Sequence, residues 1–223
     1  MSAESLSDQM HGYLTSIQKT HQSYGIPSRI SGHYRNIEHL TQENQNFILT
    51  QVQKTYEILA ELERQKVNQN DAREAIPAFL KLYGLSLWPG VLDKISQEDF
   101  FEIYNSLAQP VYKSPKFQQM TTYSLDEVYM TPFPELFERD HFSLAAIERT
   151  VQKIFSGESR MIEKPFLTHQ AWEKRGSFRV EISYKFLAGC VFRDQVTTFD
   201  SQNLRQVPTS YMLVVSKLKP ISN

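Results

Sequence analysis

A regular alternation of apolar and polar residues in the last fifth of the chain most constrains its fold. The residues that share one parity in this stretch are Phe178, Val180, Ile182, Tyr184 and Phe186. A period of two is typical of a β-strand with one buried face and one solvated face. Similar runs at 190–199 and 210–216 predict three antiparallel strands. Because their apolar face must be covered and the preceding sequence is mostly helical in pattern, we expect an α+β fold with helices over one sheet face.

The first part of the chain is predicted to be helical. Residues 1–24 carry apolar side chains at three- and four-residue steps, and residues 34–67 contain neither Gly nor Pro around a long apolar stripe. A third helix is expected to begin after Asp71, a favourable N-cap residue, and to end at Gly84.

The long stripe at 34–67 has two interpretations. It could pack on its own domain, or it could form a dimerisation helix. Turn-forming residues follow at 85–90, so we predict a helical segment over residues 1–90 and an α+β domain over 91–223.

Short elements are expected between these regions. A helix is predicted at 96–109, because acidic residues precede apolar ones at helical steps, and Ser124 with Glu127 indicates a capping box. The other expected elements are an extended piece at 110–115, a helical turn at 117–120, a break at 132–134, a helix at 143–155 closed by Gly157, a strand at 160–167 interrupted by Pro165, and a hairpin turn at 174–176.

The overall composition argues against several classes of partner. The net charge is −1, from 24 basic and 25 acidic residues, so no long-range attraction to nucleic acid is expected. No run approaches the roughly 20 apolar residues of a membrane-spanning helix. The single cysteine excludes an internal disulfide and a four-thiolate zinc site. With a polar N-terminus unlike a secretory signal, these features predict a cytoplasmic protein without a membrane partner.

Catalytic motifs are missing from the sequence. It contains no His-Glu-x-x-His, Gly-x-Ser-x-Gly or Gly-x-x-x-x-Gly-Lys-Ser/Thr pattern. The carboxylate pairs Glu98/Asp99 and Asp126/Glu127 are adjacent, so on a helix they point about 100° apart and do not converge on a substrate. We therefore expect a non-enzymatic protein.

Three local patterns follow one another in the second half. Residues 111–128 include Ser114-Pro115 and then Thr122-Tyr123-Ser124-Leu125-Asp126-Glu127. Arg139-Asp140-His141 leads into the expected helix, and residues 173–179 read Glu-Lys-Arg-Gly-Ser-Phe-Arg. In this order they resemble the PAS-domain family over about residues 97–218. That family has a strand ending in Ser-Pro before "Gly-Tyr-Ser-x-Glu-Glu-Leu", an acidic bend with a connecting helix, and an "Arg-x-Asp-Gly-Ser-x-Arg" hairpin. The chain departs from it at Thr122, where glycine is usual, and at Arg175, where aspartate is usual.

The resemblance implies a pocket between the inner sheet face and the small helices, which either holds a small apolar ligand or is filled by side chains. For the last strand, Tyr211, Leu213 and Val215 are one choice of inward parity, and Met212 and Val214 are the other. The predicted pocket residues are Tyr112, Phe117, Met120, Phe142, Ile147, Val151, Phe178, Val180, Ile182, Tyr184, Tyr211 and Leu213.

Cofactors of the family are not supported by motifs. His141 lies in the region where haem-binding members place their iron ligand, but it precedes the helix proper, and His169 is expected to be exposed or hydrogen-bonded. The flavin-binding "Asn-Cys-Arg-Phe-Leu-Gln" motif does not occur, and Cys190 is expected to be a buried strand residue. We therefore expect neither haem nor flavin and no metal.

Together these features predict a non-enzymatic regulatory or sensory PAS-like module. It would bind a ligand or a protein partner and signal through that partner or through a homodimer formed by the N-terminal helices. The alternative is a small α+β enzyme or carrier with its pocket over the sheet. A third interpretation is a structural interaction domain.

Overall fold

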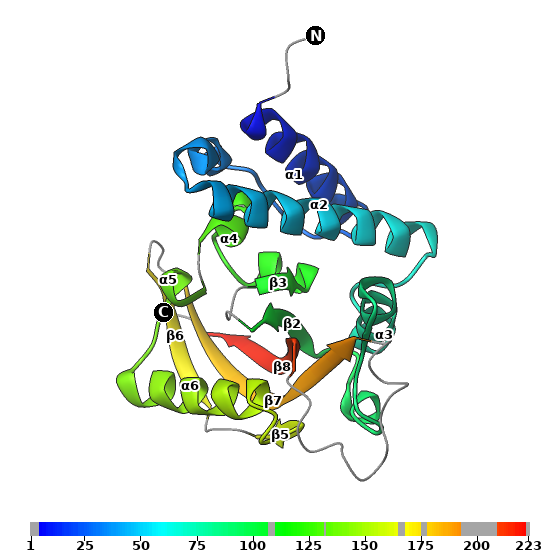
Figure 1. The fold of residues 1–223 in the computed structure, drawn as a ribbon, viewed down its shortest axis with the longest axis vertical. Helices are drawn as coiled ribbons and strands as arrows, with labels where there is room; N and C mark the ends of the chain where they lie inside the picture. Colours follow the sequence, from blue (N-terminus) through cyan, green and yellow to red (C-terminus); the bar gives the residue numbers. More distant parts are fainter. Residues whose placement is uncertain are drawn as a thin grey trace.

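The computed structural model describes residues 5–106, 110–131, 133–164, 168–174, 178–192 and 209–221. It has the predicted α+β architecture, with a curved antiparallel sheet between two groups of helices (Figure 1). The N-terminal helices cover one face of the sheet, and a single longer helix, α6 (His141–Phe155), crosses the other. The sheet is therefore covered on both faces rather than on one.

The N-terminal helices are α1 (Leu6–Ser23), α2 (Gln42–Arg64) and α3 (Ala72–Tyr83). The expected single helix at 34–67 is wrong, because a 3-10 helix, η1 (His33–His39), is separated from α2 by extended backbone at Leu40. Thr41 begins α2, since its side chain accepts a hydrogen bond from the Asn44 N–H at 3.4 Å. A polar cap within an otherwise helical stretch is therefore enough to start a new helix.

Helix α3 confirms both predicted boundaries. The Asp71 side chain accepts a hydrogen bond from the Arg73 N–H at 2.9 Å, and Gly84 ends the helix with φ +78°. A left-handed residue at this position suits glycine, which has no Cβ to clash with the backbone.

The eight described strands pair antiparallel in the order β3-β2-β8-β7-β6-β4, and β1 and β5 also pair with β7. Their bounds are β1 Leu85–Ser86, β2 Phe100–Asn105, β3 Pro110–Lys113, β4 Phe137–Glu138, β5 Met161–Glu163, β6 His169–Glu173, β7 Arg179–Phe192 and β8 Tyr211–Pro220. Two expected strands, at 178–187 and 190–199, are in fact one strand as far as Phe192. Residues 193–199, together with Pro165 and the turn residues 175–176, lie outside the described part of the chain.

Strand β2 corrects the helix predicted at 96–109. It pairs with β8 from Phe100 opposite Ser216 to Asn105 opposite Tyr211. Apolar side chains on both of its faces are buried, and such a run lacks the alternation that would distinguish it from a helix.

A β-bulge changes the direction of the side chains along β7. Tyr184 lies opposite Ser216, but Phe186 lies opposite Val215, so Lys185 is the extra residue. Its ammonium donates hydrogen bonds to Ser96 Oγ and Asp99 Oδ2, both at 2.8 Å. Phe186 is consequently on the opposite face from Tyr184, contrary to the simple alternation.

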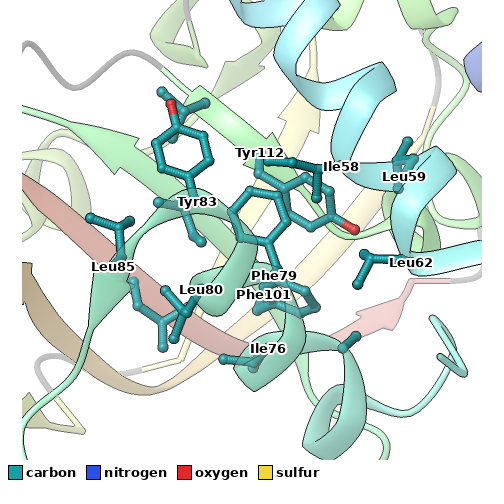
Figure 2. Packing of buried hydrophobic residues seen from close by; sticks show 14 of the residues in the cluster. Ile58, Leu59, Leu62, Ile76, Phe79, Leu80, Tyr83, Leu85, Phe101 and Tyr112 are labelled. Atoms are coloured by element: carbon teal, nitrogen blue, oxygen red, sulfur yellow. The ribbon is translucent and has the colours of Figure 1, made fainter. Parts of the chain in front are cut away.

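The main hydrophobic core joins the N-terminal helices to one face of the sheet. Figure 2 shows Phe79 of α3 beside Phe101 and Tyr112, with Leu59 and Leu62 of α2 close by. The ring centroids of Phe79 and Tyr112 are 4.1 Å apart. This core contains residues from both sides of position 90, so the predicted domain boundary does not coincide with a gap in the packing.

The apolar side chains of α2 pack in this core. This agrees with the first of the two interpretations, a helix that packs on its own domain. Ile48, Val52, Ile58, Leu59 and Leu62 are all buried within the same chain. Homodimerisation through the N-terminal helices stays a prediction, and it would have to use other residues.

Three short helices lie between β3 and α6 in the chain, and the second of them packs against η1, α1 and α2 rather than over the second face of the sheet. They are η3 (Pro115–Gln119), α4 (Leu125–Met130) and α5 (Phe133–Leu136), and a further 3-10 turn, η2 (Leu92–Lys94), lies before β2. The predicted capping box of Ser124 and Glu127 is confirmed. Helix α6 begins two residues earlier than expected, because Asp140 accepts a hydrogen bond from the Ser143 N–H at 2.9 Å.

Candidate ligand-binding cavity

A cavity of about 220 Å³ lies between α6 and the sheet. Helix α6 packs on β7 and β8, and the cavity occupies part of the space beneath it. Its lining residues are Glu102, Tyr104, Arg139, Leu144, Ile147, Glu148, Val151, Tyr184, Leu187, Met212 and Val214.

One side of the cavity is apolar. Ile147 and Val151 are one helical turn apart on α6, so their side chains lie on the same face of the helix. Leu187 of β7 lies directly opposite Val214 of β8 and forms the floor with Met212. This arrangement follows from the bulge at Lys185, which turns Leu187 toward α6.

The other side of the cavity carries polar groups. Glu102 and Tyr104 project from β2, Tyr184 from β7, and Arg139 lies just before α6. Glu102 forms an ion pair with Lys113 of β3 at 3.1 Å, and the two side chains are only 7% and 6% exposed. A pair buried to this extent has lost most of its hydration, so its members depend strongly on each other.

Arg139 is held beside Tyr184 and Phe137. Its guanidinium donates a hydrogen bond to the Phe137 carbonyl at 3.3 Å and lies 5.5 Å from the centre of the Phe137 ring. It also forms a hydrogen bond with Tyr184, whose ring stacks on His169 with the centroids 5.5 Å apart. These contacts fix the position of a cation at the edge of the cavity.

Burial controls the protonation of the two phenols. It raises the pKa of Tyr184 to about 12, although the nearby Arg139 opposes the shift. The pKa of Tyr104 is raised well above its ordinary value, first by burial and then by the Glu102 carboxylate. Burial also lowers the pKa of Lys113, against the opposing effect of Glu102. At neutral pH both phenols therefore keep their protons and can donate hydrogen bonds.

A second cavity, of about 20 Å³, adjoins the first. Glu102, Arg139 and Tyr184 line both cavities and so form the partition between them. Side chains nearly fill this smaller cavity. Its apolar wall includes Phe117, Val180 and Ile182.

Most of the predicted pocket residues lie on this face of the sheet. Ile147, Val151 and Tyr184 line the larger cavity. The residues that line the smaller one are Phe117, Met120, Val180, Ile182 and again Tyr184, and Phe178 packs against the same apolar cluster.

Four predicted pocket residues lie elsewhere. Tyr112 and Leu213 are buried in the core on the opposite sheet face, and Tyr211 packs against that core. The alternative parity of the last strand, with Met212 and Val214 toward α6, is the one that the structure adopts. Phe142 is 85% exposed, because the second residue of α6 points away from the sheet.

Several lining residues were missed by the sequence analysis. Glu102 and Tyr104 belong to the strand that was predicted as a helix, and Leu187 follows a bulge that no simple sequence pattern announces. Arg139 was part of a quoted motif, but nothing in its local sequence indicated that it faces a cavity. Leu144 and Glu148 lie on the expected helix but are not among the predicted pocket residues.

Residues considered for cofactors do not line the larger cavity. His141 is exposed at the start of α6, and His169 is buried against Tyr184. Cys190 is buried as predicted, and burial raises its pKa to about 12. Within the described ranges, no three His, Cys, Asp or Glu side chains are grouped so that they could hold a metal ion.

Among the described helices, none combines the length and the apolar character needed to cross a bilayer. Comparisons with protein-family models, with curated proteins and with solved structures find no match to this chain.

Proposed function

We propose that this protein is a non-enzymatic regulatory module of PAS-like build that binds a small ligand between α6 and the sheet. The observation that carries the proposal is the cavity of about 220 Å³, with an apolar floor and a polar edge. Ligand sites commonly combine a mostly apolar wall with a few fixed polar groups that orient the ligand.

The order of elements supports the PAS-like assignment. Strands β2 and β3 precede the short helices η3, α4 and α5, and α6 then leads to the antiparallel strands β6, β7 and β8. This is the succession that the family resemblance implies, apart from the first strand, which had been expected as a helix.

The chemistry of the cavity favours binding over catalysis. Its described lining contains no His, Cys or Asp, and both phenols have pKa values above the neutral range. A general base works best when its pKa is close to the operating pH. The polar groups are therefore better suited to orienting a ligand by hydrogen bonds than to proton transfer.

In this proposal, the signal passes through the sheet. Leu187 and Val214 face the cavity, whereas their neighbours Phe186, Leu213 and Val215 pack in the core with the N-terminal helices. Suppose that α6 can adopt two positions over the sheet. A ligand with a higher affinity for one of them would favour that position and, with it, one packing arrangement on both faces of these strands. The output would then pass to a protein partner or to a second copy of the chain, in the cytoplasm.

A cavity-filling substitution tests the site. Val151→Phe places an aromatic ring in the cavity, and we expect it to abolish ligand binding while leaving stability unchanged or raised by about 0.5–2 kcal/mol. Gln152→Phe is the matched control, because it adds the same ring to the exposed side of α6. The measurement is a thermal-shift screen of small amphipathic compounds against all three proteins.

The expected result is a set of compounds that stabilise the wild type and Gln152→Phe but not Val151→Phe. Compounds that stabilise all three proteins equally would reject this cavity as the site.

A carrier is the second candidate function, and the polar edge favours it. The structure brings Glu102, Tyr104, Arg139 and Tyr184 together, whereas an almost wholly apolar pocket was expected. A carrier would hold its ligand without altering the packing of the N-terminal helices. Protection of α2 and α3 amides from hydrogen exchange would change on ligand binding in a sensor and stay constant in a carrier.

A further inference from the structure

We propose that the cavity between α6 and the sheet takes a neutral, mainly hydrocarbon molecule, one ring with a short substituent, and that it disfavours ionised ligands of either sign. This inference rests on the proposed function and adds to it the chemical class of the ligand. It follows from the balance of charge around the cavity, from the pairing of its polar groups and from the size of its apolar part.

The apolar part of the cavity lies beneath the N-terminal part of α6. Ile154, near the end of this helix, is buried in one cluster with Leu187 and Met212 of the sheet. Leu144, near the start of the helix, is exposed although it lines the cavity. The described side chains therefore leave apolar surface uncovered between the N-terminal part of α6 and the strands.

The charged groups around the cavity balance one another. Glu102, Arg139 and Glu148 line it. Lys113 joins them through its ion pair with Glu102 at 3.1 Å, and the four side chains together carry no net charge. Glu102 and Lys113 neutralise each other in the interior, whereas Glu148 is exposed on α6, where water and salt screen its charge. The described lining thus offers a ligand no surplus of either sign.

The polar groups at the edge of the cavity are engaged with one another. Arg139 donates a hydrogen bond to the Phe137 carbonyl, forms another with Tyr184 and takes part in a further interaction within the chain. The phenol of Tyr104 interacts with the Glu102 carboxylate. An ionised head group would have to displace such partners, and it would lose its hydration without gaining a counter-charge. A neutral hydroxyl has no charge to desolvate and can both donate and accept a hydrogen bond.

Ordered water is a poor occupant of this space. A buried water needs about two to four polar partners, and more than half of the described lining is apolar. Replacing poorly ordered water by an apolar group favours binding. The cavity is therefore better suited to a hydrocarbon body than to a chain of waters.

The volume sets the size of that body. In another protein, an apolar cavity of about 150 Å³ stays dry and binds benzene. The cavity here, of about 220 Å³, has room for a ring of that size and for about two or three further non-hydrogen atoms.

Three probes that share one ring and differ in their head group test the inference by titration calorimetry on the full chain. At pH 7 benzyl alcohol is neutral, benzoate is an anion and benzylamine is a cation. We expect benzyl alcohol to bind at least about tenfold more tightly than either ion, because each ion buries a charge without a counter-charge.

The pH dependence of benzoate binding provides an independent test. A carboxylic acid has a pKa of about 4 in water, so the neutral fraction of this probe rises about tenfold for each pH unit between pH 7 and pH 5. We expect the affinity for benzoate to rise in proportion. Benzyl alcohol is the control, because it does not titrate in this range and its affinity should stay constant.

The two phenylalanine variants of α6 locate the bound probe. Benzyl alcohol should bind to the wild type and to Gln152→Phe but not to Val151→Phe, whose ring occupies the cavity. The ranking of the three probes on the wild type and the pH dependence of benzoate decide the ligand class even if Val151→Phe fails to fold.

The outcomes separate the inference from the proposed function. Equal or tighter binding of benzoate or benzylamine at pH 7, blocked by Val151→Phe, would overturn the neutral class and keep the site. A benzoate affinity that does not rise as the pH falls would also overturn the neutral class. Binding of none of the three probes, or binding that Val151→Phe leaves intact, would overturn both the neutral class and the cavity as the site.

Discussion

At the scale of single residues, Gly189 of β7 lies where the sheet leaves no room for a side chain. A Cβ added there would be 2.6 Å from Thr209 Oγ1 and 2.9 Å from Thr209 Cγ2, closer than real Cβ contacts. Thr209 is itself buried, so it has little space into which to move. Glycine is required here by packing rather than by backbone conformation.

The substitution Gly189→Ala is therefore expected to lower the free energy of unfolding by about 1–3 kcal/mol, since overpacking displaces a buried neighbour. Gly12→Ala provides the contrast, because a Cβ at this position of α1 would meet no atom within 4 Å. Alanine there should raise stability by about 0.5–1 kcal/mol through its better helix propensity. Urea unfolding of both variants measures the two effects, and a neutral Gly189→Ala would show that Thr209 moves freely.

Single residues also decide which face of β7 meets the cavity. Lys185 occupies the bulge, and its ion pair with the buried Asp99 at 2.8 Å holds it there. The simple alternation holds from Phe178 to Tyr184, because this part of β7 precedes the bulge. Beyond Lys185 the parity is reversed, so Phe186 enters the opposite core and Leu187 enters the cavity.

At the scale of elements, Asp126 of α4 connects two segments that are far apart in the sequence. Its carboxylate accepts hydrogen bonds from the Ser31 N–H at 3.0 Å and from the Tyr34 N–H at 3.1 Å. Burial by itself would raise the pKa of this carboxyl, but the hydrogen bonds, including those from Ser124 and Ser31, lower it overall. The start of η1 is thus anchored to α4 by a charged acceptor.

Asp126→Ala should lower the free energy of unfolding at pH 7 by about 2–4 kcal/mol, because buried N–H groups lose their acceptor. A lowered pKa means that the contribution of Asp126 is complete above the unfolded value of about 3.9 and is lost as the pH falls through the folded value. The difference between wild type and variant should therefore shrink between pH 7 and pH 3 in urea unfolding. Asp93→Ala, on the exposed surface, is the control, and its free energy of unfolding should stay within about 0.5 kcal/mol of the wild type at both pH values. If the destabilisation by Asp126→Ala were the same at pH 7 and pH 3, Asp126 would not act as a charged acceptor.

Elements with clear local signals were predicted well. Helix α3 has its N-cap and its terminal glycine, and α4 has its capping box, so each carries its boundaries in a few adjacent residues. Strand β2 lacked such a signal, since both of its faces are buried and its sequence fits helical spacing equally well. The candidate site depended on that strand, and for this reason Glu102 and Tyr104 were missed.

At the scale of the whole molecule, one hydrophobic core holds the N-terminal helices and the sheet together. Leu59, Leu62 and Phe79 pack with Phe101 and Tyr112 across the predicted boundary (Figure 2). Strand β1 additionally pairs with β7, with Leu85 opposite Phe192. The helices are therefore part of what stabilises the sheet.

A fragment of residues 91–223 is expected not to fold on its own. Without the helices it would expose the core face of the sheet, including Phe101, Tyr112, Phe186, Leu213 and Val215. Circular dichroism and the dispersion of amide signals in NMR spectra would measure its structure, with the full chain as the reference. A cooperative thermal transition of the fragment would contradict this expectation and support two independent domains.

The sequence by itself determined the fold class, the first and third N-terminal helices, the capping box of α4 and the alternation that places Val180, Ile182 and Tyr184 on the inner face. These features depend on periodicity and capping, which involve residues close together in the chain. Only the tertiary structure decided that β2 is a strand, that β7 reverses its parity at Lys185, and that Arg139 and Glu102 line the same cavity. Those outcomes depend on burial from two sides and on pairing between distant segments, and neither interaction leaves a periodic trace in the local sequence.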